Sequence, residues 1–233
     1  MSKQEEVYLV VGSKSWSRQV FDERISTLSG RWHFLGAREE LTLAEVRKLS
    51  PRYIFFLHWS WKVPDELISD YECICFHMTD VPYGRGGSPL QNLIMRGHRQ
   101  TKLTALRMTQ NLDAGPVYMK EDLSLEGRAE EIYIRATHLS ARMIATLICS
   151  KLQPVAQTGE PAIFKRRKPE ESEIPELESL QALHDFIRML DAEGYPKSFL
   201  MHKGFRYEFS RAVRDDGQIV SEVTIRQAAE AKQ

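Results

Sequence analysis

The chain has 233 residues, 32 basic and 32 acidic side chains, and a hydrophobic content of 42%. These values suit one packed α/β domain with a small appendage, and a net charge of zero argues against a nucleic-acid binder, whose surface would be basic. No apolar run of signal-peptide or membrane-spanning length occurs, and three cysteines are too few for a disulfide scaffold. We therefore expect a cytoplasmic protein that binds neither nucleic acid nor membrane.

The first third of the chain alternates short apolar runs with short amphipathic segments. Strands are predicted over residues 7–11, 32–35, 53–57 and 71–76, and helices are predicted between them, beginning near Ser15, after Thr42 and at Asp65. Thr42 is a suitable N-cap for the second of these helices. Such alternation is typical of a right-handed, mostly parallel sheet, so we expect an α/β fold with flanking helices.

The rest of the chain continues the sheet and then adds a separate region. A helix over 88–96, strands over 101–109 and 117–125 around a turn at 113–116, and a long helix over 129–152 are predicted in that order. Residues 1–160 are expected to form the main domain, and residues 161–233 a small C-terminal extension with a helix over 180–190 and a β-hairpin around Lys203-Gly204. Two or three strands cannot bury a face alone, so this hairpin is a candidate homodimer element.

One stretch, residues 73–91, has the character of a site. A buried strand breaks at His77 into a loop that contains Thr79, Asp80 and Arg85. Ser88-Pro89 then signals a helix N-terminus, with Ser88 as the N-cap. Open α/β sheets bind ligands outside the carboxyl ends of their strands, so this loop is the predicted ligand site.

His77 is the candidate general acid or base of this site. A neutral imidazole near pH 7 can take a proton from one group and return it to another. An Asp close to the ring would fix its tautomer and stabilise the imidazolium, and Asp113 is the candidate. The residues alone leave open whether the two meet, since Asp also suits the turn before Gly115.

The cysteines of this stretch suggest other chemistry. Cys73, Cys75 and His77 are spaced so that their side chains share one face of a strand. Three ligands on one strand cannot easily surround a zinc ion tetrahedrally, so we expect no metal. Two alternatives remain for Cys75: a nucleophile beside His77, or a small buried hydrophobic residue.

The same stretch resembles the folate-dependent formyltransferases, the methionyl-tRNA formyltransferase-like family. That family has the patterns N-x-H, P-x-x-R-G-x-x-P-[IL]-Q and L-D-x-G. Here His77 precedes P-Y-G-R-G-G-S-P-L-Q over residues 82–91, and L-D-A-G follows at 112–115. The tail segments R-R-K-P-E at 166–170, I-R-M-L at 187–190 and Tyr195-Pro196 are similar to the sugar N-formyltransferases of that family.

The resemblance implies a Rossmann-like domain that binds 10-formyltetrahydrofolate at the sheet edge, from which an acceptor amine takes the formyl group. His77 would be the acid or base, and Asp113 and Cys75 would complete the catalytic set. The donor would be bound by Arg85, Gly86, Leu90, Leu112 and Gly115. The acceptor pocket would be shaped by Thr79, Asp80, Tyr83 and Gly84.

Two positions depart from the family pattern. Cys75 stands where the family has Asn, and a thiol is a weaker hydrogen-bond donor than an amide. Pro116 stands where an acidic residue usually follows L-D-x-G. The alternatives are therefore acyl transfer from a different donor, a ligand-binding relative without catalysis, and hydrolytic deformylation.

The predicted acceptor is the amine of an activated amino sugar. The tRNA-modifying branch of the family carries a further C-terminal barrel domain, which this chain is expected to lack. The expected function is therefore an amino-sugar N-formyltransferase of glycan biosynthesis, with 10-formyltetrahydrofolate as co-substrate.

Overall fold

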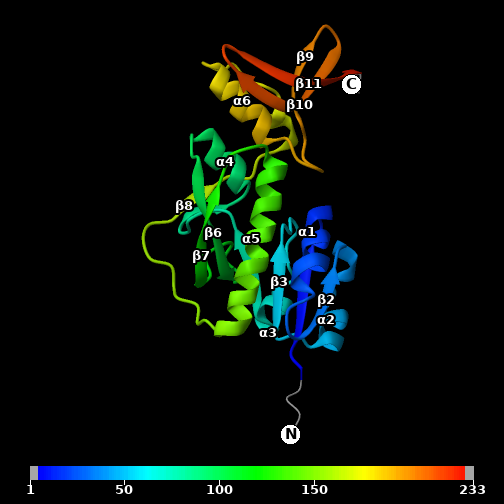
Figure 1. Ribbon diagram of the computed structural model, residues 1–233, viewed down its shortest axis with the longest axis vertical. Helices are drawn as coiled ribbons and strands as arrows, with labels where there is room; N and C mark the ends of the chain where they lie inside the picture. Colours follow the sequence, from blue (N-terminus) through cyan, green and yellow to red (C-terminus); the bar gives the residue numbers. More distant parts are fainter. Residues whose placement is uncertain (1–4, 229–233) are drawn as a thin grey trace. The chain divides into compact units, whose positions relative to one another are not determined.

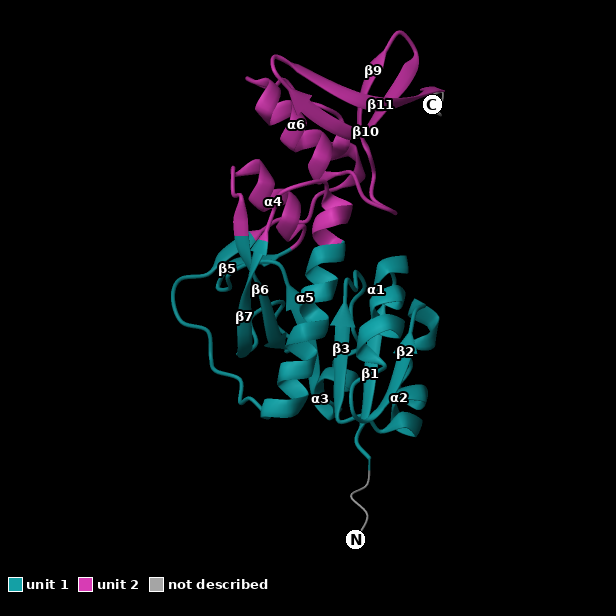
Figure 2. Cartoon of the chain, viewed as in Figure 1, with its two compact units in different colours: residues 1–86, 101–123, 134–163 teal, residues 87–100, 124–133, 164–233 magenta. Residues whose placement is uncertain are grey.

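The structure is a computed structural model, and residues 5–228 are described (Figure 1). They divide into two compact units (Figure 2). The first unit contains the residues up to 86 together with 101–123 and 134–163. The second contains 87–100, 124–133 and the residues from 164 onward, so it takes two internal segments in addition to the C-terminal extension.

The first unit is built on a six-stranded mixed sheet with the order β2-β1-β3-β4-β6-β7. Its strands are β1 Val7–Gly12, β2 Arg31–Leu35, β3 Tyr53–Leu57, β4 Cys73–His77, β6 Gln100–Arg107 and β7 Val117–Ser124. β1 pairs in parallel with β2 and β3, and β3 with β4, whereas β4 and β6 are antiparallel. The predicted α/β architecture with a mostly parallel first half is confirmed.

Helices flank this sheet, and one side of it forms a continuous apolar core. The helices are α1 Ser15–Val20, which continues as a π-helical turn Phe21–Ile25, α2 Leu43–Leu49, α3 Asp65–Asp70 and α5 Ala129–Ser150. Thr42 caps α2 as predicted, since its hydroxyl accepts the Glu45 N–H. Burial of each large apolar side chain stabilises such a core by about 1.5–3 kcal/mol. The core cluster includes Leu9, Val11, Val46, Ile54, Phe56, Leu67 and Cys73.

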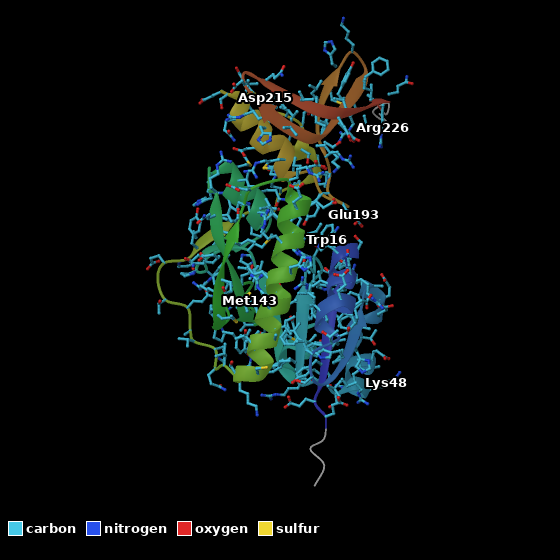
Figure 3. The ribbon with its side chains drawn as sticks, viewed as in Figure 1. Trp16, Lys48, Met143, Glu193, Asp215 and Arg226 are labelled. Carbon is cyan, nitrogen blue, oxygen red and sulfur yellow. The ribbon has the colours of Figure 1, made fainter. Side chains whose placement is uncertain are left out.

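The long helix α5 runs across the sheet (Figure 1). One face of α5 is buried, and Met143, which is labelled in Figure 3, is among its most buried residues. Of the residues that the structure describes, no helix is both long and apolar enough to span a bilayer.

Two local predictions differ from the structure. β4 includes His77 as its last residue, so the histidine is held by the sheet and not by the loop. Helix α4, Pro89–Met95, begins with Pro at its first position and has Ser88 at the N-cap position as expected, but the Ser88 side chain makes no capping hydrogen bond. Ser88 has a left-handed backbone with φ 49°, and its hydroxyl accepts the Arg167 N–H. Its side chain is therefore engaged outside the helix.

The second unit contains a three-stranded antiparallel sheet with the order β11-β10-β9. Its strands are β9 Ser198–His202, β10 Phe205–Asp215 and β11 Gln218–Gln227, and α6 Leu180–Met189 packs against β10. The predicted hairpin around Lys203-Gly204 is confirmed by the β9–β10 pairing. Ser179 caps α6 by accepting the Ala182 N–H.

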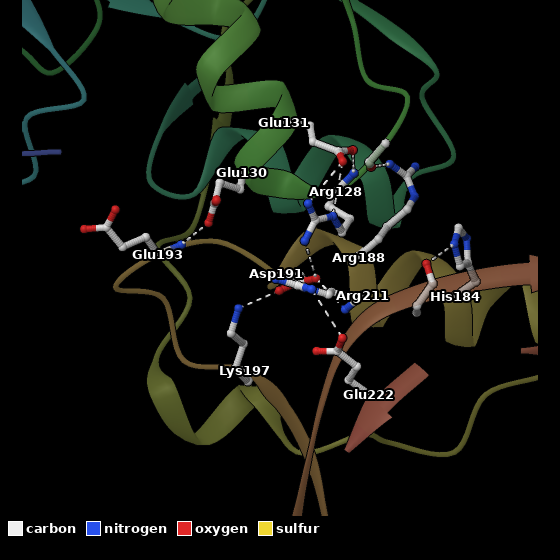
Figure 4. A network of polar contacts seen from close by, with 12 residues as sticks. Arg128, Glu130, Glu131, His184, Arg188, Asp191, Glu193, Lys197, Arg211 and Glu222 are labelled. Carbon is white, nitrogen blue, oxygen red and sulfur yellow. Dashed lines mark hydrogen bonds and ion pairs between the residues drawn. The ribbon is translucent and has the colours of Figure 1, made fainter. Parts of the chain in front are cut away.

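A charged network organises this second unit around Asp191 (Figure 4). Its carboxylate accepts from Lys197 Nζ at 2.5 Å and from the Arg211 N–H at 2.7 Å, and Arg128 lies at 3.5 Å. Burial alone would raise the pKa of Asp191, but the Lys197 and Arg211 hydrogen bonds and the Arg128 charge hold it below its ordinary value. The folded state therefore favours the ionised carboxylate of Asp191.

Asp191→Asn should lower the free energy of unfolding at neutral pH by about 2–4 kcal/mol, because hydrogen bonds to a buried charge are lost. Since folding lowers the pKa of Asp191, its contribution is present above the unfolded-state pKa and is lost as the pH falls through the folded-state value. The difference between wild type and variant should therefore shrink as the pH is lowered. Urea unfolding at several pH values measures it.

Asp122→Asn is the matched control, because the Asp122 carboxylate pairs with Lys102 while remaining 84% exposed. An exposed ion pair of this kind contributes about 0–1 kcal/mol. Equal losses of stability in the two variants at every pH would contradict the role given to Asp191.

Candidate active site

His77 and Asp113 meet at the carboxyl end of β4, within the first unit. Asp113 Oδ2 lies 3.6 Å from His77 Nδ1, and both side chains are about nine-tenths buried. On the other side of the ring, His77 Nε2 is 2.8 Å from the Gly84 carbonyl oxygen. The imidazole is therefore held between a carbonyl and a carboxylate.

This arrangement assigns the proton of the neutral ring. A carbonyl oxygen can only accept a hydrogen bond, so Nε2 carries the proton that it donates to Gly84. Nδ1 then has a free lone pair that faces Asp113. A proton taken up at Nδ1 would face the Asp113 carboxylate at ion-pair distance. The site thus places a negative charge next to the nitrogen that is free to remove a proton from another group.

The local backbone explains why the L-D-x-G turn presents its carboxylate in this way. Asp113 has a left-handed backbone with φ 51°, which costs about 1–2 kcal/mol for a residue with a side chain. A Cβ at Gly115 would lie 1.8 Å from the Arg107 carbonyl oxygen, so only glycine fits there. Asp113 Oδ2 also accepts the Gly86 N–H at 2.9 Å. The carboxylate therefore joins its turn to the His77 loop.

The loop after His77 is fixed by its own hydrogen bonds. Thr79 is fully buried, and its hydroxyl donates to the Gly84 carbonyl at 3.2 Å while its own carbonyl accepts from the Thr104 hydroxyl at 2.7 Å. Residues 83–86 form a short strand, β5 Tyr83–Gly86, that pairs with β8 Ala162–Phe164. The loop is thus a defined structure that holds the Gly84 carbonyl against His77.

The other predicted binding residues have different surroundings. The Asp80 carboxylate pairs with Lys120 Nζ at 2.5 Å, and Tyr83 is at the surface. Leu112 is 70% exposed, whereas Leu90 is fully buried and belongs to the second unit. Their roles in binding donor or acceptor stay predictions.

Cys75 lies two residues before His77 on β4 and is half-buried. Burial raises the pKa of its thiol, and the nearby negative charge of Asp113 raises it further. Burial also raises the pKa of Cys73, to about 12. Both residues are therefore thiols at neutral pH, which is unfavourable for a nucleophile or a metal ligand. Within residues 5–228 no group of three His, Cys, Asp or Glu side chains is placed to hold a metal ion.

One residue of the site was not predicted from the sequence. Gln157 lies in the irregular segment between α5 and β8, and its amide contacts Arg85, Asp113 and Gly115. The motifs of the sequence do not extend to this segment, and a single Gln outside a regular element carries no periodic signal. Gln157 also lines an open cleft of about 360 Å³. The other residues of the cleft are Asp80, Val81, Pro82, Val117, Lys120, Val155, Ala156 and Thr158.

Known proteins resemble this chain in two ways. A family model described as the C-terminal domain of methionyl-tRNA formyltransferase matches residues 169–226. A curated protein named methionyl-tRNA formyltransferase, from Rickettsia felis, is 28% identical over 140 residues, which cover 58% of this chain and 46% of that protein. This chain spans about half the length of the curated relatives it matches. The matched residues 169–226 lie within the segment predicted as a small C-terminal extension.

Solved structures extend the similarity over nearly the whole chain. A methionyl-tRNA formyltransferase from Clostridium thermocellum is 41% identical, with a TM-score of 0.91, and the match covers 96% of this chain and 100% of that one. A 4-N formyltransferase from Francisella tularensis is 15% identical with a TM-score of 0.66 over 98% of each chain, which shows a shared fold.

Alkylation of the three cysteines tests the raised thiol pKa values. With iodoacetamide near neutral pH, the exposed Cys149 should be modified, whereas Cys73 and Cys75 should remain unmodified in the folded protein because almost no thiolate is present. Peptide mass spectrometry over a time course measures this, and all three should be modified in urea. Labelling of Cys75 faster than that of Cys149 would instead indicate an activated nucleophile.

Proposed function

The chain belongs to the folate-dependent formyltransferase family, and from that premise we propose that it transfers a formyl group from 10-formyltetrahydrofolate to a primary amine. The observation that carries the proposal is the position of His77 between the Gly84 carbonyl and the Asp113 carboxylate. It supplies one group able to receive the proton that an attacking amine must lose.

In the proposed reaction, the amine nitrogen forms a bond to the formyl carbon and the bond from that carbon to the donor nitrogen breaks. His77 Nδ1 receives the proton of the amine, and the same proton is returned to the departing nitrogen. Asp113 stabilises the imidazolium between these two steps. Proton transfer of this kind accelerates reactions by about 10²–10⁴-fold.

Two features of the site fit a folate donor. When bound, this donor supplies the formyl carbon. The cleft that Gln157 lines contains the apolar side chains of Val81, Pro82, Val117 and Val155 together with polar ones, a combination typical of small-molecule sites. Arg85 forms no ion pair with a carboxylate among the described residues, because its bonds go to the neutral Gln157. We propose that its charge serves an anionic part of a ligand.

Cys75 and Pro116 are the two positions where the donor site departs from the family pattern. The thiol of the half-buried Cys75 donates only weakly to the formyl oxygen, so a backbone N–H or the protonated His77 must take a larger share. Transfer from another acyl donor, ligand binding without catalysis, and deformylation by water remain the alternatives to formyl transfer. The raised pKa of Cys75 argues against a covalent acyl-cysteine route.

The first candidate acceptor is an activated amino sugar, supported by the tail segments that resemble sugar N-formyltransferases. The second is methionyl-tRNA, supported by the name and the 41% identity of the Clostridium thermocellum protein and by the family model over 169–226. Both acceptors present a primary amine. A homodimer through the β9–β10 hairpin is a separate proposal that does not depend on the acceptor.

His77→Gln should lower the rate of formyl transfer by about 10²–10⁴-fold without loss of fold, because Gln cannot carry the proton. The measurement is the release of tetrahydrofolate under single-turnover conditions, with circular dichroism as the check on folding. His202→Ala, at an exposed residue of β9, is the control and should leave the rate unchanged. Equal rates in wild type and His77→Gln would exclude His77 as the acid or base.

An acceptor panel separates the two candidate substrates. Purified protein and 10-formyltetrahydrofolate are incubated with nucleotide-linked amino sugars in one set and with methionyl-tRNA in another, and the formylated product is identified by mass spectrometry. Turnover with a sugar supports the first candidate. Turnover with the tRNA supports the second, and its affinity should then fall steeply with salt, because phosphate contacts release counterions. No turnover with either set, together with binding of a folate, would favour a non-catalytic relative.

A further inference from the structure

The side-chain amide of Gln157 makes four hydrogen bonds inside the candidate site. Its Nε2 donates to the carbonyl oxygens of Asp113 at 2.9 Å and Gly115 at 2.7 Å. Its Oε1 accepts from Arg85 Nε at 3.0 Å and from Arg85 Nη2 at 2.8 Å. Both donor hydrogens and both acceptor lone pairs of the amide are thus used.

The partners also fix which end of the amide is which. Carbonyl oxygens cannot donate and a guanidinium cannot accept, so rotating the amide by half a turn would place like groups against each other on both sides. Glutamate in the same place could keep the Arg85 bonds but could not donate to the two carbonyls. These contacts therefore require the amide group of a glutamine at position 157, and not merely a side chain of similar size.

These bonds close a ring that includes the catalytic carboxylate. Gln157 joins Arg85 to the backbone of Asp113, and the Asp113 carboxylate returns to the N–H of Gly86, the residue next to Arg85. The same carboxylate oxygen is the one that faces His77 Nδ1. Any shift of the Asp113 turn would therefore move the carboxylate relative to the imidazole.

The backbone of the turn needs such support. Asp113 has φ 51°, a conformation that side chains disfavour, and residues held in this way persist only where their surroundings determine them. The segment that carries Gln157 is itself anchored, because Val155 and Val117 exchange two backbone hydrogen bonds of 2.7 and 2.8 Å. Gln157 is thus held firmly enough to hold the turn.

We propose that Gln157 is a positioning residue for formyl transfer, which holds the Asp113 turn so that the carboxylate stabilises the His77 imidazolium. The inference rests on the proposed function. Gln157 acts through Asp113 and does not itself touch the reacting atoms. Its removal should lower kcat by about 10–100-fold, the scale at which a displacement of about 1 Å affects catalysis, with little change in KM for the donor.

The test is a double-mutant cycle built from Gln157→Glu, Asp113→Asn and the variant with both changes. Gln157→Glu keeps the Arg85 contact and removes the two donations to the turn. If Gln157 acts through Asp113, Gln157→Glu should lower kcat in the wild type but have no further effect in the Asp113→Asn background. Equal losses in both backgrounds would overturn the proposal, as would an unchanged kcat. Gln153→Glu, at an exposed Gln of the same segment, is the matched control.

A second measurement separates this inference from the proposed function. The imidazole ¹⁵N signals of His77 are recorded in the wild type, Gln157→Glu, Gln157→Met and Gln153→Glu. Displacement of the Asp113 carboxylate should shift the Nδ1 signal in both Gln157 variants and not in the control. Unchanged signals in the two folded Gln157 variants would overturn the positioning role. If the Nδ1 signal shifts in the Gln157 variants as expected but the wild type transfers a formyl group to no acceptor, the positioning role stands and only the proposed function is contradicted.

Discussion

The site depends on the two acceptors that hold the His77 ring: the Gly84 carbonyl on Nε2 and the Asp113 carboxylate facing Nδ1. In the neutral ring, Nε2 donates to the Gly84 carbonyl and Nδ1 has a free lone pair. The Asp113 carboxylate lies at ion-pair distance from that nitrogen, which is the arrangement that a general base requires. The same carboxylate accepts the Gly86 N–H, so it is fixed before any substrate arrives.

The positions of these acceptors follow from the sheet and from a few backbone constraints. β4 ends at His77, whereas its antiparallel neighbour β6 ends at Arg107, opposite Ile74 near the start of β4, and the turn that follows β6 brings Asp113 to within 3.6 Å of the His77 ring. Gly115 allows the turn to approach the Arg107 carbonyl, and Thr79 holds the loop that carries the Gly84 carbonyl. The disfavoured backbone of Asp113 is offset by hydrogen bonds from Gln157 and Gly86.

Much of the fold could be predicted because it depends on local patterns. Strand and helix periodicity predicts the sheet, and Thr42 predicts the start of α2. The motif spacing points to His77 and Asp113, which lie together in the structure. Ser88 shows the limit of this approach: the motif Ser-Pro indicates a helix start, but a contact with the Arg167 N–H directs the hydroxyl elsewhere. Gln157 had no local signal at all, since its three partner residues lie 42 to 72 positions away in the chain.

The most direct test of this account is the tautomer of His77 in the ligand-free protein. Histidine-labelled protein contains seven imidazoles, and the His77 signals are assigned by their loss in the His77→Gln variant. The ¹⁵N shifts of the neutral ring should show the proton on Nε2, with Nδ1 unprotonated beside Asp113. A proton on Nδ1 in the neutral ring would mean that the Gly84 carbonyl does not orient the imidazole, and the proton route proposed here would be wrong.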